Sequence, residues 1–249
     1  MLFVVSTPIG NLEDITFRAV ATLREVDLIA AEDTRHAQIL LNHYQVRKPL
    51  VSFHEHNEAR RTQELTARLS QGEKVALLTD AGMPSISDPG YRLISACRQQ
   101  GIPVTVLPGP SAVLTALVGS GLPTASFYFG GFVPVKSGQR RSELERATSR
   151  EATSVYFESP HRLIRSLEVL AELAPDRLVC VARELTKRFE EFAVRTPGLL
   201  LEHYSAHPPR GEITLVIAPL PRRSHRGQGS SAEHAEHAEK EETSTDYTD

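Results

Sequence analysis

The fold class is decided by LLTDAGMPSISDPG at residues 77–90, together with LPGPSA at residues 107–112. Each stretch begins as an apolar, strand-like run, breaks into a Gly/Pro-rich loop and ends at a helix start, with Asp88 (before Pro89) or Ser111 as the cap. If the two strands are neighbours, the loops meet at the strands' carboxyl ends, where open α/β sheets bind small molecules. Two ordinary βα turns are the alternative. The first loop exceeds the usual length of about 2–6 residues, which favours a ligand cradle.

The common phosphate-binding motifs are missing from these loops. The first predicted strand, residues 2–6, leads into TPIGN at residues 7–11 without a Gly-x-Gly-x-x-Gly, and the chain contains no Walker-type Gly-Lys-Ser/Thr. A cradle of Pro, Gly, Ala and Ser with few charges instead suits a ligand that is held by backbone groups and apolar contact.

Strand and helix signals alternate through the first half of the chain. Strands are predicted at residues 2–6, 28–31, 50–53, 75–79 and 104–107, and helices at residues 15–26, 34–43, 57–71, 90–100 and 111–119. Such alternation is typical of an open, mostly parallel sheet that is covered by helices.

A second unit follows the turn-rich GSGLPT at residues 119–124. Strands are predicted at residues 127–130, 154–157, 178–182, 189–194 and 213–218, and helices start at Ser159-Pro160 and Thr196-Pro197. We therefore predict an N-terminal α/β domain over residues 1–119 and a C-terminal α/β domain over residues 125–220, with a cleft between them. Residues 221–249 are rich in Ser, Gly, Glu and His, which predicts a disordered tail.

Composition indicates a globular protein of the cytoplasm. The chain has 249 residues, enough for a sizeable core, and no apolar run of about 20 residues that could span a membrane. MLFVVS at residues 1–6 lacks the basic start of a signal peptide and is expected to be a core strand. Cys97 and Cys180 lie far apart on a predicted helix and a predicted strand, so we expect buried free thiols.

The charge balance limits how the chain could bind nucleic acid. The tail holds 4 of the 28 basic and 7 of the 31 acidic residues, which leaves 24 of each in the rest of the chain. Because the folded part is neutral, RNA binding would need a local basic patch. One candidate segment contains Lys136, Arg140, Arg141, Arg146 and Arg150. The alternative for this segment is a solvated helix, in which Glu143, Glu145 and Glu151 offset the positive charge.

Four further polar clusters stand at or near predicted strand ends. AEDTR at residues 31–35 offers carboxylates and Arg35 for a cleft, or a helix cap from Asp33 or Thr34. In FHEHN at residues 53–57 two histidines share one face, but no third ligand is placed, so we expect no metal site. FESPHR at residues 157–162 and ARELTKRFEE at residues 182–191 follow apolar strands, which favours a cleft lining over a solvated face or a buried network.

Taken in chain order, these motifs resemble those of the tetrapyrrole-methylase-type (class III) S-adenosylmethionine methyltransferases. Within that family the chain is most similar to the enzymes that methylate a cytidine ribose 2′-hydroxyl in small-subunit ribosomal RNA. The resemblance covers residues 2–218 and rests on TPIGN, AEDTR, FHEHN, TDAGMPSISDPG, LPGPSA, FESPHR, ARELTK and the GE of residues 211–212. So many motifs in order make the match specific.

The resemblance implies two α/β domains with S-adenosylmethionine in the cleft between them, a homodimer, and small-subunit ribosomal RNA or the assembled small subunit as the partner. The cofactor contacts that it implies are Pro8, Asp80, Ala81, Gly82, Met83, Pro84, Ser85, Ile86, Ser87, Gly109, Pro110, Ser111, Ala112, Phe157, Leu185 and Gly211. Met83 stands where the family usually has Thr, so only backbone contacts carry over at that position.

The catalytic centre is predicted to draw on Asp33, Arg35, Glu158 and Lys187, whose motifs follow strands at the cleft. A ribose hydroxyl is a very weak acid, so a lysine neutralised by burial would accept its proton better than an ordinary carboxylate. Lys187 is the prime candidate, oriented by Asp33 or Glu158, while Arg35 would hold RNA phosphate. Positioning of the substrate without a dedicated base remains an open alternative.

Two other functions fit the same motifs. A methyltransferase for a tetrapyrrole or another small molecule would share the cofactor site, have a wide pocket for an anionic ring and need no basic segment. An RNA-binding assembly factor with vestigial cofactor loops would have no catalytic activity. Tight cofactor binding would count against this second alternative.

Overall fold

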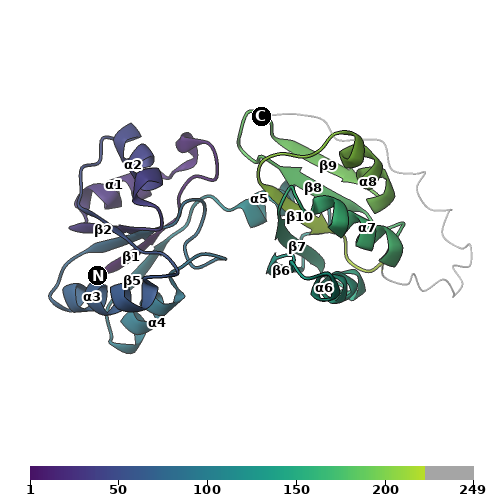
Figure 1. The fold of residues 1–249 in the computed structure, drawn as a ribbon. Coiled ribbons are helices and arrows are strands. Elements are labelled where there is room, and N and C mark those ends of the chain that lie inside the picture. Colours follow the sequence, from purple (N-terminus) through teal and green to yellow (C-terminus); the bar gives the residue numbers. More distant parts are fainter. Residues whose placement is uncertain (222–249) are drawn as a thin grey trace, which may run out of the picture.

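Two five-stranded sheets, each covered by helices, form the two halves of the computed structural model, which describes residues 1–221 (Figure 1). The α/β fold expected from the sequence is confirmed. The predicted tail, beyond Pro221, lies outside the described residues. No helix in residues 1–221 is long and apolar enough to cross a membrane.

The first sheet is entirely parallel, and a helix connects every strand to the next. Its order is β3 (Leu50–Ser52), β2 (Leu28–Ala31), β4 (Val75–Leu78), β1 (Leu2–Val5) and β5 (Val104–Leu107). One face is covered by α1 (Phe17–Glu25), which follows the short η1 (Leu12–Asp14), and by α2 (Thr34–His43). The other face is covered by α3 (Glu58–Ser70) and α4 (Tyr91–Gln99).

The second sheet is mixed. Its order is β6 (Phe127–Phe132), β7 (Thr153–Glu158), β10 (Ile213–Ile217), β8 (Val179–Arg183) and β9 (Glu191–Arg195), and only β6 and β7 are parallel. One face is covered by α6 (Ser137–Ser149), α7 (Leu163–Leu173) and α8 (Pro197–Ala206). The last strand of the chain, β10, thus occupies the centre of this sheet.

Helix α5 (Ala112–Gly119) covers the other face of the second sheet, although it follows the last strand of the first. Its residues Val113, Ala116 and Leu117 share a buried cluster with Cys180 and Val216. Figure 1 shows α5, in teal, beside β10. The chain therefore passes from one half to the other at residues 108–111.

The structure confirms some of the helix starts that were predicted from cap signals and contradicts others. Ser111 caps α5, and Thr196-Pro197 opens α8 as expected. The prediction from Asp88-Pro89 was wrong, because Gly90, with φ +143°, is the cap of α4. The prediction from Ser159-Pro160 was also wrong, because α7 begins only at Leu163, after a turn in which the Ser159 carbonyl accepts hydrogen bonds from the two backbone amides at 162 and 163. Cys97 and Cys180 are buried free thiols, as predicted.

Candidate functional site

Both Gly/Pro loops converge on the end of β1, because β1 lies between β4 and β5. Thr7 and Gly82 exchange two backbone hydrogen bonds, at 2.9 and 3.0 Å. The Ser6 hydroxyl donates to the Pro110 carbonyl at 2.7 Å. These bonds join the loops at the carboxyl edge of the first sheet as expected, although the two strands are not neighbours and β1 provides the link between the loops.

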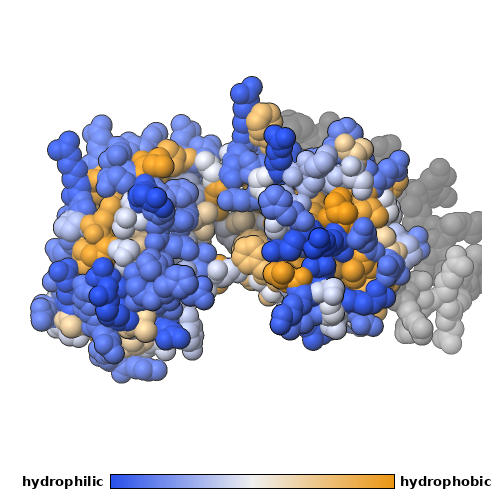
Figure 2. All heavy atoms as spheres, in the orientation of Figure 1, coloured by the Kyte–Doolittle hydropathy of each residue, from blue (hydrophilic) through white to orange (hydrophobic). Residues whose placement is uncertain are grey.

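A cavity of about 470 Å³ lies where the two halves meet, and Figure 2 shows the surface hollowed between them. Most of the predicted cofactor contacts line it: Asp80, Ala81, Gly82, Met83, Ile86, Ser87, Ser111, Ala112, Phe157 and Gly211. Glu158, a predicted catalytic residue, lines it as well. This volume lies in the range of about 300–1,000 Å³ that is usual for small-molecule sites.

A smaller cavity of about 200 Å³ adjoins the large one, since both are lined by Ile9, Asp80, Ala81 and Glu212. Pro8 and Lys187, two further predicted site residues, line the smaller cavity. The two cavities therefore form one cleft, in which the N-terminal loops face the β8–β9 loop and the turn before β10.

The other predicted site residues do not line the cleft: Asp33, Arg35, Pro84, Ser85, Gly109, Pro110 and Leu185. Leu185 is buried in the core beside α5. A Cβ on Gly109 would lie 2.9 Å from the Ser6 Cβ, so this glycine permits the close approach of the loop to β1. Asp33 caps α2, and its carboxylate accepts two hydrogen bonds from the Arg35 guanidinium, at 3.1 and 2.7 Å. That guanidinium holds the pKa of Asp33 well below its usual range.

Glu32 lines the large cavity, as the AEDTR motif led us to expect of its carboxylates, and so do Asp88 and Glu212, which the sequence analysis did not single out as site residues. Glu32 accepts a hydrogen bond from the Thr79 hydroxyl at 2.6 Å. Burial, and next the charge of Glu32, raise the pKa of Asp88 to about 6. Burial also raises the pKa of Asp80, whose Oδ1 accepts from the Asp33 backbone amide at 3.1 Å. The cleft thus holds an acidic cluster (Glu32, Asp80 and Asp88).

Asp88→Asn is expected to stabilise the protein at neutral pH. The folded state binds the Asp88 proton more tightly than the unfolded chain, so stability is full below pH 4 and is lost as the pH rises through about 6. Asparagine cannot ionise and avoids that loss, which we put at about 1 to 2 kcal/mol after allowing for solvent exposure. Thermal unfolding should show a higher Tm for the variant at pH 7.5 and nearly equal values at pH 4. The exposed Asp176→Asn is the control, and a variant no more stable than this control at pH 7.5 would contradict the assignment.

Lys187 is charged in the structure, which corrects the expectation that burial neutralises it. Its Nζ donates to Glu184 Oε1 at 3.0 Å and to Glu212 Oε2 at 2.9 Å. Burial lowers the pKa of Lys187, but the hydrogen bonds to Glu212 and Glu184 outweigh it and hold the pKa above its usual value. The partners of Lys187 are therefore Glu184 and Glu212. The prediction that Asp33 or Glu158 orients it was wrong.

Glu158 is fully buried, and its carboxylate is used by its own half of the molecule. It accepts hydrogen bonds from the Ser159 amide at 2.7 Å, from Arg162 Nε at 3.2 Å and from the Ser166 hydroxyl. This arrangement fixes the turn between β7 and α7 that forms one wall of the large cavity. Glu158 therefore holds the wall in position.

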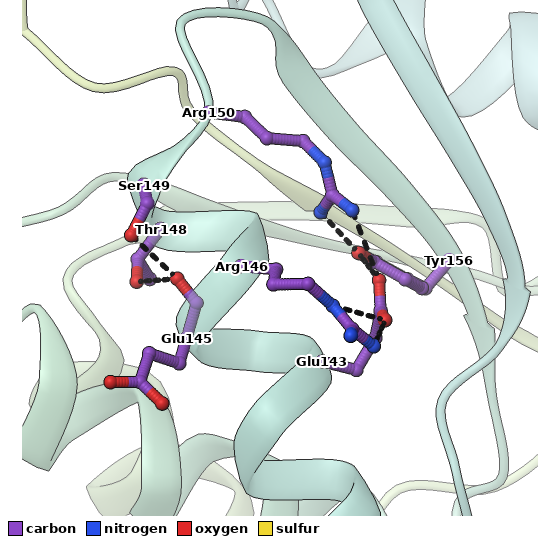
Figure 3. A network of polar contacts seen from close by, with 7 residues as sticks. All are labelled: Glu143, Glu145, Arg146, Thr148, Ser149, Arg150 and Tyr156. Atoms are coloured by element: carbon purple, nitrogen blue, oxygen red, sulfur yellow. Dashed lines mark hydrogen bonds and ion pairs between the residues drawn. The ribbon is translucent and has the colours of Figure 1, made fainter.

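The basic segment forms α6 and its two caps, and four of its five cationic side chains have a partner within the protein. The Arg146 and Arg150 guanidiniums bind the Glu143 carboxylate, which also accepts a hydrogen bond from the Tyr156 hydroxyl at 2.6 Å (Figure 3). Arg140 is 4% exposed and donates to the Val135 carbonyl at 2.6 Å. Arg141 pairs with Glu172 at 2.6 Å. Lys136 is exposed, and RNA binding by this segment stays a prediction.

His54 and Asn57 of FHEHN hold together the loop that precedes α3. The Asn57 amide nitrogen lies 3.0 Å from His54 Nε2, and its oxygen accepts from the His54 backbone amide at 2.9 Å. Over residues 1–221, no group of three or more His, Cys, Asp or Glu side chains is arranged to hold a metal ion.

Comparison with known proteins matches most of the chain. A family model described as Tetrapyrrole (Corrin/Porphyrin) Methylases matches residues 1–198. The ribosomal RNA small subunit methyltransferase I of Thermotoga maritima is 48% identical over 217 residues, which are 87% of this chain and 97% of that protein. The protein of the same name from Escherichia coli O157:H7 is 46% identical over 219 residues, which are 87% of this chain and 77% of the relative.

Solved structures share the fold at low sequence identity. Diphthine synthase has a TM-score of 0.65 at 15% identity, with 87% of this chain and 89% of the other covered. The uroporphyrin-III-C-methyltransferase from Thermus thermophilus has a TM-score of 0.61 at 22% identity, with 87% and 93% covered. Both likenesses concern the arrangement of the helices and strands alone.

Proposed function

This chain belongs to the tetrapyrrole methylase family, and we propose that it transfers the methyl group of S-adenosylmethionine to a cytidine ribose 2′-hydroxyl in small-subunit ribosomal RNA. The observation that carries the reaction class is the cleft, which is lined by both halves and by most of the motifs singled out in the sequence. The substrate is supported by the curated relatives, which are named for small-subunit ribosomal RNA and match 87% of this chain.

The large cavity fits S-adenosylmethionine in its chemistry. S-adenosylmethionine supplies an electrophilic methyl group on a positively charged sulfur, and it also carries an ammonium group. The acidic cluster attracts a cation, while Met83, Phe157 and Ile213 provide an apolar surface. Gly82, with φ +80°, presents its backbone directly to the cavity.

The proposed cofactor contacts are those of the large cavity, with Pro8 from the smaller one. Gly109, Pro110 and Leu185 would act by holding these contacts in place, because they lie behind the lining and not in it.

In the reaction, the chain's own residues orient the ribose and stabilise its oxygen. We propose that the charged Nζ of Lys187 lies against the 2′-oxygen, where it favours the negative charge that develops as the proton leaves. Glu212, which is hydrogen-bonded to Lys187 and largely exposed, is the nearby carboxylate that can accept the proton as the methyl group transfers, when the hydroxyl becomes far more acidic than in free ribose. The acceptor role that the sequence analysis gave to Lys187 therefore passes to Glu212.

We also propose that the enzyme works in the cytoplasm as a homodimer and that it acts on the assembled small subunit. The homodimer is supported by exposed apolar side chains on three successive elements, β5, α5 and β6: Val106, Leu114, Val118, Phe127 and Tyr128. Both β5 and β6 are edge strands of their sheets.

Methyl transfer is tested directly with tritiated S-adenosylmethionine. Small ribosomal subunits are purified from a strain that lacks the enzyme, incubated with the full chain, and digested to nucleosides. Tritium in 2′-O-methylcytidine is the expected result. Tritium in another nucleoside would mean that the proposed target nucleotide is wrong. Methyl transfer to a tetrapyrrole but not to subunits would favour the small-molecule alternative.

Gly82→Val is expected to weaken S-adenosylmethionine binding at least tenfold. Valine is strained at φ +80°, and its branched side chain would enter the lining of the large cavity. Calorimetry on the folded variant measures the affinity. Gly101→Val is the matched control, because Gly101 has φ +70° with open space around its Cβ position. Equal affinity in the two variants would place the cofactor elsewhere.

A further inference from the structure

A separate groove of about 620 Å³ lies beside the cleft in the second half of the molecule. It is lined by residues from the β8–β9 loop, from α8 and from the segment after α8. Five of them carry the charge or the rings that could bind a ligand: Arg188, Phe189, His203, His207 and Arg210. We call it the β8–β9 groove. None of these five residues lines either cavity of the cleft.

The groove lining carries an excess of positive charge, because three arginines (Arg183, Arg188 and Arg210) face two carboxylates. Its two carboxylates are engaged: Glu190 accepts from the Thr186 amide at 2.6 Å, and Glu191 pairs with Arg183 at 3.0 Å. The guanidiniums of Arg188 and Arg210, in contrast, form no ion pair with any side chain in residues 1–221. Two exposed arginines are thus available to an anionic ligand.

An exposed aromatic ring lies next to these charges. Phe189 is 64% exposed, and the Arg188 guanidinium carbon lies 5.4 Å from the centre of its ring. A phenylalanine ring is usually buried against other side chains in a protein core. The ring of Phe189 instead faces the groove. A flat apolar ring beside a guanidinium offers a nucleobase a stacking surface and its phosphate a partner.

Two chain segments lead from the cleft directly into the groove. Lys187 lines the smaller cavity and the next residue, Arg188, lines the groove. Gly211 lines the large cavity and the preceding residue, Arg210, lines the groove.

The loop at this junction is held in a strained conformation. Glu184 has φ +49° and Thr186 has φ +63°, both in the left-handed region. Residues other than glycine are uncommon in this region and persist where the surrounding structure imposes them. Here the Glu184 and Glu212 bonds to Lys187, and the Glu190 bond to the Thr186 amide, impose the conformation. The groove is therefore fixed in position relative to the cleft.

We propose that the β8–β9 groove binds the single-stranded RNA that flanks the target cytidine, with a base stacked on Phe189 and phosphates against Arg188 and Arg210. This proposal rests on the proposed function, because the cleft places the target ribose next to Lys187. Single-stranded RNA suits the groove better than a protein partner does, since stacked aromatics and free cations together match its repeating base and phosphate.

The test measures binding of a fluorescein-labelled oligocytidylate of ten nucleotides by anisotropy, over a series of salt concentrations. Phe189→Ala is expected to weaken binding about 5- to 100-fold, and Phe189→Trp to restore it. Arg188→Ala combined with Arg210→Ala should lower the slope of log K against log salt by about 1.4, since each phosphate contact contributes about 0.7 on a single strand. Matched controls are Phe17→Ala and Arg18→Ala, exposed neighbours of the same two residue types on α1.

Parallel methyl-transfer assays on small subunits separate this proposal from the proposed function. Groove variants that match the α1 controls in affinity and in salt slope overturn the groove assignment, whether or not the wild type methylates. If the wild type transfers no methyl group but its RNA binding depends on the groove, the reaction is wrong and the groove stands. Variants that lose self-association or another protein contact while keeping RNA binding assign the groove to a protein and overturn the proposal.

Discussion

Lys187→Met is expected to lower the single-turnover rate of methyl transfer to small subunits by about 100- to 1,000-fold, the usual effect of removing one group that stabilises a developing oxyanion. Methionine keeps the length of the side chain but removes the charge that Glu184 and Glu212 maintain at the cleft. Because Lys187 lines the smaller cavity and not the larger one, S-adenosylmethionine affinity should change little. Rapid quench at saturating RNA and cofactor measures the rate.

Two further variants make this result specific. Lys187→Arg keeps the positive charge and should retain a large part of the rate. Lys136→Met removes an exposed lysine of the basic segment and should behave like the wild type at saturating RNA. Wild-type rates for Lys187→Met would remove the lysine from the reaction and leave positioning of the substrate as the source of catalysis.

Gly211→Val should abolish most of the activity while leaving the two sheets folded. A Cβ at this position would lie 2.2 Å from Glu184 Oε1 and 2.6 Å from Glu184 Cγ, at a φ of +83°. Glu184 Oε1 accepts from Lys187 Nζ and from the Glu212 amide, both at 3.0 Å, so displacing it breaks both bonds. We expect the single-turnover rate to fall at least 100-fold, because the groups proposed to act on the ribose lose their arrangement.

Gly72→Val is the control for backbone strain, since Gly72 has φ +95° and no heavy atom within 4 Å of its Cβ position. Both variants should lose about 1–2 kcal/mol of stability in thermal unfolding from backbone strain, and Gly211→Val should lose more because it also breaks the two Glu184 bonds. Only Gly211→Val should lose the methyl-transfer rate. A similar loss in both would mean that general destabilisation, and not the Glu184 contact, causes the effect.

Local patterns in the sequence predicted the features that depend on neighbouring residues. The alternation of strands and helices, the caps at Ser111 and Thr196 and the convergence of the two Gly/Pro loops all appear in the structure. The Asp88-Pro89 signal failed because a positive-φ glycine follows it, so the helical conformation starts only after Gly90. The carboxylate expected to cap a helix instead contributes to the cleft.

Features that depend on contacts between residues distant in the chain could not be predicted from the sequence. The state of Lys187 follows from Glu212, which reaches it only because β10 pairs with β8 in the centre of the sheet. The arginines of the basic segment look like a free patch in the sequence, but Glu143 and Tyr156 pair with Arg146 and Arg150. The β8–β9 groove needs α8 and the segment after it, and no local pattern links these residues to Phe189.

The central position of β10 governs the order in which the halves can form during synthesis. All five strands of the first sheet have been made once Leu107 has left the ribosome, so that sheet can assemble early. Helix α5 emerges next, but two of its partners, Cys180 and Val216, come later, and β10 is the last strand to appear. An apolar helix therefore stays uncovered while about a hundred residues are added. Nascent chains of this protein would need protection over that interval, and the surface in need of it is α5.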